Sequence, residues 1–387
     1  MLKVLYLVPN LADSAVARRI HMLRLGGAEI DVAGFRRAGT DVPELDVGAY
    51  VELDETFDAQ FAQRLWATVR ARASIRRWAA RLPQPDLIIA RNLEMLSLAS
   101  RLRGFWPNQP PIVYECLDIH RLMLREDGIG RAMRGAERYW SKQSSLLLTS
   151  SPAFLRNYFD VYGGPPAEIV ENKVLWDGEA RGRNPALAEP ASQGTPLRIG
   201  WFGALRCARS LHALTGLADA MGGDVEIVLR GRPALTEFDD FHGTVASQPH
   251  LRFEGAYRNP DDLTAIYSDV HLAWAIDFFE AGQNSQWLLP NRIYEGSLHG
   301  AIPVALAGTE TAAFIERHRI GIVLPDIEPQ TLRTMLGGLT QARLAELATA
   351  VAALHAGHFA AAADDCRALV DKLSSLTTTT APLTEAA

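Results

Sequence analysis

The segment from Trp287 to Val304 combines residue types that can bind an anion together with neighbouring hydroxyl groups. Pro290 can begin a helix, because the N–H that it lacks would be unpaired at that position anyway. The free N–H groups and the dipole of such a helix favour an anion, and Asn291 and Arg292 stand at its start. Glu295 follows within about one turn, where its carboxylate can accept hydrogen bonds from vicinal hydroxyls. An ordinary helix leading into a strand, with Glu295 in solvent, explains the local pattern equally well.

A second candidate anion site is Gly200-Trp-Phe-Gly-Ala-Leu-Arg-Cys-Ala-Arg-Ser210, where we expect a strand, a glycine turn and then a helix. Gly203 allows a close backbone approach, and Arg206 or Arg209 can clamp a diphosphate through charge-assisted hydrogen bonds. The start of a surface helix would account for the same residues. Two further charged residues follow expected strands: Arg230, in an expected loop Arg230-Gly-Arg-Pro233, and Asp277, which can touch a ligand or cap a helix.

Acidic and basic groups that can move a proton follow a buried strand at Val113-Tyr-Glu-Cys-Leu-Asp-Ile-His120. Asp118 can act there as a general base toward an acceptor hydroxyl, and His120 either assists or is a structural histidine. Asp13 is a rival base, although an N-cap of the following helix is the favoured interpretation. Two polar residues after a neighbouring strand can orient the acceptor: Arg91 and Asn92.

Residues 64–82 hold six arginines, two tryptophans and no acidic residue. A helix of this kind can lie on an anionic bilayer with tryptophan at the interface. An amphipathic helix whose tryptophans face the core is the alternative. The sequence Arg101-Leu-Arg-Gly-Phe-Trp106 can extend the basic surface.

Apolar runs typical of buried strands alternate with helix-like stretches through most of the chain, which predicts an α/β fold. The alternation indicates doubly wound parallel sheets with helices on both faces. Such sheets bind ligands at the carboxyl ends of their strands, and two of them would face a central cleft. The expected strands span residues 2–8, 30–35, 86–90, 112–116, 145–149, 167–170, 197–202, 225–229, 251–253, 270–275, 302–305 and 321–324.

Domain boundaries follow from changes in composition. Residues 181–196 are rich in Pro, Gly and polar residues, and they predict a linker between domains at 1–180 and 197–355. Residues 341–376 are rich in alanine and predict helix, with residues 356–376 packing back on the first domain. The polar tail, residues 377–387, is expected to be disordered.

Composition narrows the class of protein. Hydrophobic residues make up 48% and charged residues 22%, as in soluble globular proteins. No apolar run is long enough to span a membrane, and three scattered cysteines argue against a disulfide framework or a zinc site. The net charge of −6 argues against a general nucleic-acid binder.

Pro290-Asn-Arg-Ile-Tyr-Glu295, followed by Gly300 and Pro303-Val304, resembles the donor-binding segment of GT-B glycosyltransferases. The resemblance is to the large family-4-like group that includes exopolysaccharide-building enzymes, and it covers nearly the whole chain. It implies that the first domain binds the acceptor and the second a sugar nucleotide. The implied donor contacts include Tyr294, with Glu295 on the ribose hydroxyls and basic residues on the diphosphate.

The chain departs from that family at one important position. Many retaining members carry a second glutamate eight residues before the ribose-binding one, and here that position is Trp287. Asn284 lies close by and can reach the sugar, but it supplies no carboxylate. The resemblance with this departure favours an inverting transfer with Asp118 as base.

The expected reaction is transfer of a sugar, glucose first, from a UDP-sugar to a hydroxyl of a lipid-linked acceptor in exopolysaccharide or surface-glycan synthesis. No Asp-x-Asp pair for a metal is present, so we expect no metal or cofactor. The expected location is the cytoplasm, at the inner face of the membrane if residues 64–82 bind it. Two alternatives stay open: a UDP-sugar 2-epimerase of the same fold, and a non-catalytic subunit that binds a sugar nucleotide.

Overall fold

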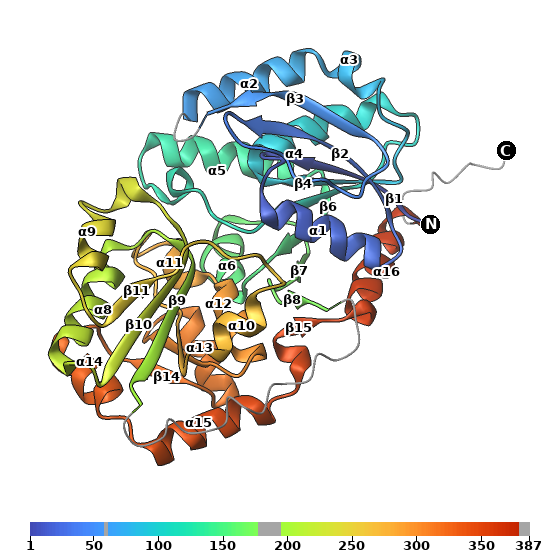
Figure 1. Cartoon of the computed structure of the whole chain (residues 1–387). Coiled ribbons are helices and arrows are strands. Elements are labelled where there is room, and N and C mark those ends of the chain that lie inside the picture. The colour runs from blue at the N-terminus through green and yellow to red at the C-terminus, as the bar shows by residue number, and fades with distance from the viewer. Residues whose placement is uncertain (58–60, 177–194, 379–387) are drawn as a thin grey trace. The chain divides into compact units, whose positions relative to one another are not determined.

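The computed structural model describes residues 1–57, 61–176 and 195–378, and it divides into two compact units (Figure 1). Unit 1 holds Met1–Glu171 together with the chain from Ala361 onward, and unit 2 ends at Ala360. Apart from residues 195 and 196, the predicted linker at 181–196 lies outside the described residues, as does the predicted disordered tail beyond residue 378.

Unit 1 is built on a seven-stranded parallel sheet in the order β3-β2-β1-β4-β5-β6-β7. Every residue of the central strands β4 and β5 is buried, because helices cover both faces of a parallel sheet. The strands are β1 (Lys3–Val8), β2 (Glu29–Arg37), β3 (Tyr50–Thr56), β4 (Leu87–Arg91), β5 (Ile112–Cys116), β6 (Ser144–Thr149) and β7 (Ala167–Ile169).

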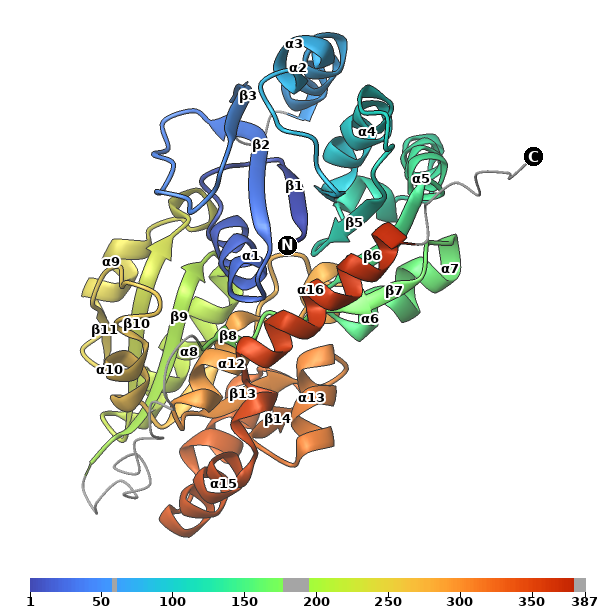
Figure 2. The same cartoon turned by 90° about the vertical axis from the view of Figure 1, so that its right-hand side faces the viewer.

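Helices cover both faces of this sheet. Helix α1 packs against α16, while α4 lies between α2 and α5 over β4 and β5 (Figure 2). The side chains of Cys366, Leu369, Val370 and Leu373 on α16 join the core beneath α1. The helices are α1 (Ser14–Leu25), α2 (Phe61–Ala73), α3 (Ile75–Ala79), α4 (Asn92–Leu102), α5 (Gly128–Ser141), α6 (Pro152–Phe154), α7 (Asp160–Tyr162) and α16 (Ala363–Thr378), with the 3-10 turns η1 (Arg103–Phe105) and η2 (Arg121–Leu124) and the π-helical turn η3 (Leu155–Phe159).

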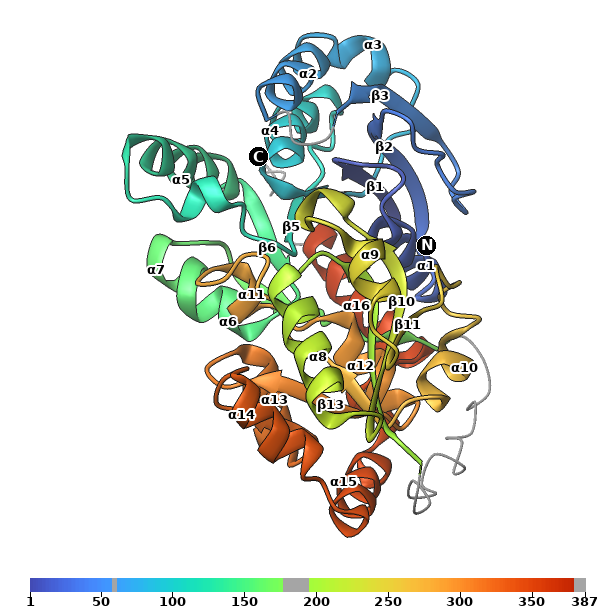
Figure 3. The same cartoon turned by 60° about the vertical axis from the view of Figure 1, so that its left-hand side comes forward.

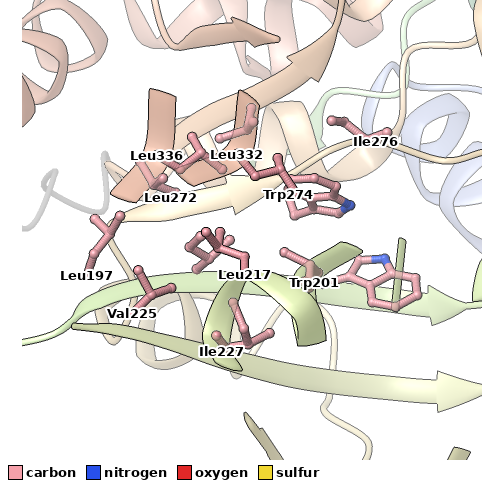
Figure 4. Packing of buried hydrophobic residues seen from close by; sticks show 14 of the residues in the cluster. Leu197, Trp201, Leu217, Val225, Ile227, Leu272, Trp274, Ile276, Leu332 and Leu336 are labelled. Carbon is pink, nitrogen blue, oxygen red and sulfur yellow. The ribbon is translucent and has the colours of Figure 1, made fainter. Parts of the chain in front are cut away.

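Unit 2 has a six-stranded parallel sheet in the order β11-β10-β9-β12-β13-β14. Trp201 and Trp274, on neighbouring strands, are fully buried in a cluster with Leu217, Leu332 and Leu336 (Figure 4). The strands are β9 (Leu197–Leu205), β10 (Val225–Pro233), β11 (Leu251–Phe253), β12 (Leu272–Trp274), β13 (Ile302–Leu306) and β14 (Ile322–Leu324).

The helices of unit 2 also lie on both faces of the sheet. Helix α8 packs on β10 (Figure 3) and, in the contacts of the fold, also on the turn η6. Helix α12 packs on β12 and β13, and it also contacts α10. The helices are α8 (Ala208–Met221), α9 (Phe241–Ala246), α10 (Leu263–Ser268), α11 (Asn284–Trp287), α12 (Asn291–Leu298), α13 (Glu310–His318), α14 (Pro329–Leu332) and α15 (Gln341–Ala353), with the 3-10 turns η5 (Leu235–Glu237) and η7 (Ala356–His358) and the π-helical turn η6 (Arg333–Gly337). The two segments that pass between the units pair with each other as β8 (Val174–Leu175) and β15 (Ala360–Ala361).

All twelve expected strands are present, and the α/β prediction is confirmed. The sequence analysis missed the edge strand β3, since its alternating acidic residues hide an apolar pattern. Three further details were wrong. Residues 230–233 continue strand β10 instead of forming a loop, the helical structure expected throughout 341–376 is interrupted at 354–362, and Thr377 and Thr378 belong to α16.

Candidate active site

The strand order of unit 2 reverses between β9 and β12, which lie side by side. Loops that leave the carboxyl ends of two such strands diverge to opposite faces of the sheet, and the opening between them is the usual ligand site of doubly wound sheets. Arg206 and Arg209 follow β9, and Asp277 follows β12. The fold therefore brings these predicted donor residues to one place.

Gly203 lies within β9, opposite Gly231 of β10. Both residues have positive φ angles, +102° and +131°. A Cβ atom on Gly231 would lie 1.9 Å from the carbonyl oxygen of Gly203, so the two backbones approach more closely than any side chain permits. Arg230 precedes this contact in the strand, and its guanidinium lies 3.6 Å from Glu254.

The two loops at the switch point are joined by side-chain contacts. Arg206 Nε lies 3.3 Å from Asp277 Oδ2, and its guanidinium stacks over the ring of Phe279. The Arg209 guanidinium covers Phe278 at 4.2 Å from the ring centroid. Aromatic rings thus orient both arginines, a role for Phe278 and Phe279 that the sequence motif did not reveal.

Helix α12 begins at Asn291, and Pro290 is its N-cap residue. Asn291 is exposed at the first turn, while Arg292 lies along the helix, donating from Nη1 to the carbonyl of Trp274 at 3.2 Å. Tyr294 is fully buried against Phe314, so its side chain supports the helix from within the core. The exposed start of α12 can therefore face a ligand, whereas the side chain of Tyr294 cannot.

Glu295 is 5% exposed and is held from two sides. Its Oε1 accepts a hydrogen bond from Asn259 Nδ2 at 2.7 Å, and its Oε2 accepts from Tyr267 at 3.4 Å. Burial raises the pKa of Tyr257, and the negative charge of Glu295 raises it further. The sequence analysis missed Asn259, Tyr257 and Tyr267, because they come from a segment with no recognisable motif.

A small pocket opens beside Asp277, between the ends of β12 and β13. Its polar lining consists of Asp277, Ser285, Gln286, Thr309 and Thr311. Asn284 is buried behind this surface and donates to Glu280 at 2.6 Å, so it holds the loop in shape. Trp287, at the position of the family's first glutamate, ends helix α11 and is half-buried.

In unit 1 the strand order also reverses between neighbours, here β1 and β4. Asp13 follows β1 and caps α1, its Oδ1 accepting from the Ala15 N–H at 2.9 Å, which confirms the favoured interpretation. Its Oδ2 lies 3.5 Å from Arg91 at the end of β4. Asn92 adopts a φ of +68°, a strained geometry at the same edge of the sheet.

Beneath this edge lies a buried ionic cluster. Glu115 has no exposed surface and pairs with Arg19 at 2.6 Å, while Tyr6 donates to its other oxygen and Arg91 lies 4.0 Å away. Burial alone would raise the pKa of Glu115, but the charges of Arg19 and Arg91 outweigh it and hold the pKa below its ordinary value. The predicted acceptor residue Arg91 is thus also a structural cation.

Asp118 and His120 follow β5, the strand next to β4. Asp118 is exposed at this edge of the sheet. His120 caps the turn η2, its Nδ1 accepting from the Leu122 N–H at 3.3 Å. The position of Asp118 suits a proton acceptor, whereas His120 has a local structural task.

The basic segment 64–82 forms α2, α3 and the turn that follows. Trp66 is 66% exposed, as expected for a tryptophan at a membrane interface. Trp78 is buried, as expected for a tryptophan that faces the core. In the described part of the chain, Arg76, Arg77 and Arg81 are exposed and have no ion-pair partner. In all the residues that the structure describes, no helix is long and apolar enough to cross a membrane.

Comparison with known proteins assigns the chain to a family. It is 51% identical over 380 residues to the succinoglycan biosynthesis protein ExoL of Rhizobium meliloti, covering 97% of this chain and 94% of ExoL. No family model matches it.

Solved structures share the fold over almost their whole length. A sucrose-phosphate synthase from Thermosynechococcus elongatus aligns with a TM-score of 0.70 at 12% identity, covering 98% of this chain and 100% of the synthase. HepE of Anabaena, in complex with UDP and glucose, aligns at 0.66 and 15% identity, covering 97% and 100% of the two chains. The chain therefore belongs to the family of ExoL, a succinoglycan biosynthesis protein, and has the GT-B fold.

Proposed function

We propose that this enzyme transfers glucose from UDP-glucose to a hydroxyl group of a lipid-linked oligosaccharide during exopolysaccharide synthesis. The observation that carries the donor proposal is the set of groups at the switch point of unit 2: Arg206, Arg209, the start of α12 and the buried carboxylate of Glu295. The complexes of HepE with UDP and with UDP-glucose support this choice of donor. The name of ExoL supports exopolysaccharide as the product.

In the proposed donor complex, Glu295 accepts hydrogen bonds from the ribose hydroxyls. Asn259 and Tyr267 already fix its side chain, so little further entropy is lost on binding. The arginines and the α12 N-terminus hold the diphosphate and stabilise the charge that grows on it as the sugar leaves. We propose that these groups act in place of a divalent metal, and that the enzyme needs no cofactor.

For the acceptor, we propose that Asp118 takes the proton of the attacking hydroxyl. The acceptor oxygen then bonds to the anomeric carbon while the bond to the diphosphate breaks, and the diphosphate keeps the electron pair. Trp287 supplies no carboxylate where retaining relatives have one, which supports a single inverting displacement. The anomeric configuration of the product tests this proposal, and net retention would exclude Asp118 as the base.

The donor is tested by titrating the protein with a panel of UDP-, GDP- and ADP-sugars and by measuring their turnover. We expect UDP-glucose to bind, and Glu295→Gln to weaken its binding at least tenfold. Glu316→Gln, on the exposed side of α13, is the matched control and should bind normally. Binding of another nucleotide alone would refute the donor assignment, and donor consumption without an acceptor would indicate an epimerase.

We also propose that the enzyme works in the cytoplasm, at the inner face of the membrane. The exposed Trp66 supports contact with anionic lipid, as do Arg76, Arg77 and Arg81, which have no ion-pair partner among the described residues. A lipid-linked acceptor would hold its reactive sugar near that surface.

A further inference from the structure

Arg206, which follows β9, and Arg292, on α12, share one acidic partner, Asp277. The side chain of Asp277 is 5% exposed, and its Oδ2 lies 3.3 Å from Arg206 Nε and 3.9 Å from Arg292 Nη2. Its other oxygen accepts a hydrogen bond from the Phe279 N–H at 2.8 Å. Both carboxylate oxygens therefore face protein groups.

Each arginine is fixed by a second contact as well. The guanidinium of Arg206 lies over the Phe279 ring at 4.7 Å, and Arg292 donates to the Trp274 carbonyl. The guanidinium group is planar, and Asp277 and a second contact hold it in place in each arginine. Its remaining N–H donors therefore point in a fixed direction. This arrangement prepares both cations before a ligand arrives.

The loop that carries Asp277 is itself attached to the loop that carries Arg206. Ser210 Oγ donates to the Ile276 carbonyl at 3.2 Å, and the Phe278 N–H donates to Cys207 Sγ at 3.3 Å. Asp277 thus stays beside Arg206 independently of the ion pair. A change in its charge can be made without releasing the loop.

We propose that Asp277 is a positioning residue that aims Arg206 and Arg292 at the diphosphate and lowers their combined charge, so that the nucleotide product can leave. This inference rests on the proposed UDP-sugar donor. The three side chains carry a net charge of +1 instead of +2, which weakens the attraction for a bound diphosphate. Orientation speeds the chemical step, while the reduced charge limits how tightly the product is held.

The test is the affinity for UDP, measured by calorimetry at low and high salt, together with the steady-state rate. Asp277→Asn keeps the size of the side chain and an oxygen that can accept from Phe279, but it removes the charge. We expect UDP to bind roughly threefold or more tightly to this variant, with a steeper dependence on salt. We also expect a lower kcat that tracks slower release of UDP.

Asp269→Asn is the matched control. Asp269 also bridges two arginines, Arg198 at 2.8 Å and Arg252, but it precedes β12 and so lies at the opposite end of the sheet from the switch point. This variant should leave the UDP affinity unchanged. Asp277→Glu, which keeps the charge, should bind UDP within about twofold of the parent protein.

The outcomes separate the two proposals. If the unchanged protein binds no UDP, the donor proposal fails whatever the variants do. If it binds UDP but Asp277→Asn binds it equally or more weakly, the inference about Asp277 is overturned. Unchanged UDP affinity with weakened UDP-glucose binding would instead place Asp277 on the sugar. Should Asp277→Asn not fold, Asp277→Ser provides a second neutral variant under the same expectations.

Discussion

The Asp13 carboxylate lies 3.5 Å from the Arg91 guanidinium, joining the loop after β1 to the end of β4 at the switch point of unit 1. The same guanidinium is 4.0 Å from the fully buried Glu115. Arg91 therefore connects the exposed edge of the sheet to the ionic cluster beneath it.

Replacing Arg91 with Met should lower the free energy of unfolding by about 3 kcal/mol, because removing one partner leaves buried charge poorly compensated. Urea denaturation of the two proteins measures this difference. Arg81→Met, at an exposed arginine of the same unit, is the control and should change stability little. Unchanged stability with weaker acceptor binding would show that Arg91 acts only on the acceptor.

Gly231→Ala should destabilise unit 2 by about 3 kcal/mol, since the new methyl group meets the Gly203 carbonyl at a positive φ. Gly104→Ala is a suitable comparison, because a Cβ there meets no atom within 4 Å. Thermal unfolding followed by circular dichroism measures both variants. Equal melting temperatures for them would refute the close approach of β9 and β10.

His271 links β9 to β12, its Nδ1 accepting from the Arg198 N–H at 2.9 Å. Burial lowers the pKa of His271 below its ordinary 6.5, and the charge of Arg198 lowers it further. A depressed pKa means that the neutral ring stabilises the fold above about pH 6.5 and that this contribution is lost as the pH falls through the folded-state pKa.

The stability difference between the parent protein and His271→Asn should therefore shift in favour of the variant as the pH falls from 7.5 to about 5. An asparagine oxygen can accept the same hydrogen bond and does not titrate. Denaturant unfolding across this pH range measures the difference. His212→Asn, at an exposed position of α8, serves as the control, and a pH-independent difference for His271 would contradict the prediction.

Binding to vesicles that contain anionic lipid should weaken about a hundredfold when Arg76, Arg77 and Arg81 are all changed to Gln, at about 1 kcal/mol for each arginine. Flotation of the protein with anionic and zwitterionic vesicles measures this. Arg317, Arg333 and Arg343, exposed in unit 2, provide a triple-Gln control of equal charge. Equal loss in the two triple variants would show a general charge effect instead of a specific surface formed by α3 and the turn that follows it.

Sugar transfer should continue at an unchanged rate after dialysis against EDTA, because arginines and a helix N-terminus are proposed to hold the diphosphate. Arg206→Met should lower the rate at least tenfold under the same conditions, since it removes one of those cations. Among the described residues, no His, Cys, Asp or Glu side chains cluster as a metal site. Activity lost on chelation and restored by Mg²⁺ or Mn²⁺ would contradict the proposal.

The sequence by itself determined the α/β class, all twelve expected strands and the segment that carries Glu295, because buried parallel strands and helix starts leave local patterns. It did not reveal β3, whose exposed edge position allows acidic residues, nor the extension of β10 through Gly231.

Only the tertiary structure decided which distant side chains meet. It placed Asn259 and Tyr267 on Glu295, Asp277 between two arginines, and Glu115 beneath Arg91. Such contacts depend on the strand order and on the loops at a switch point. Neither of these produces a repeating pattern of apolar and polar residues in the sequence. A charged residue after a strand can be recognised locally, but its partner is chosen by the fold.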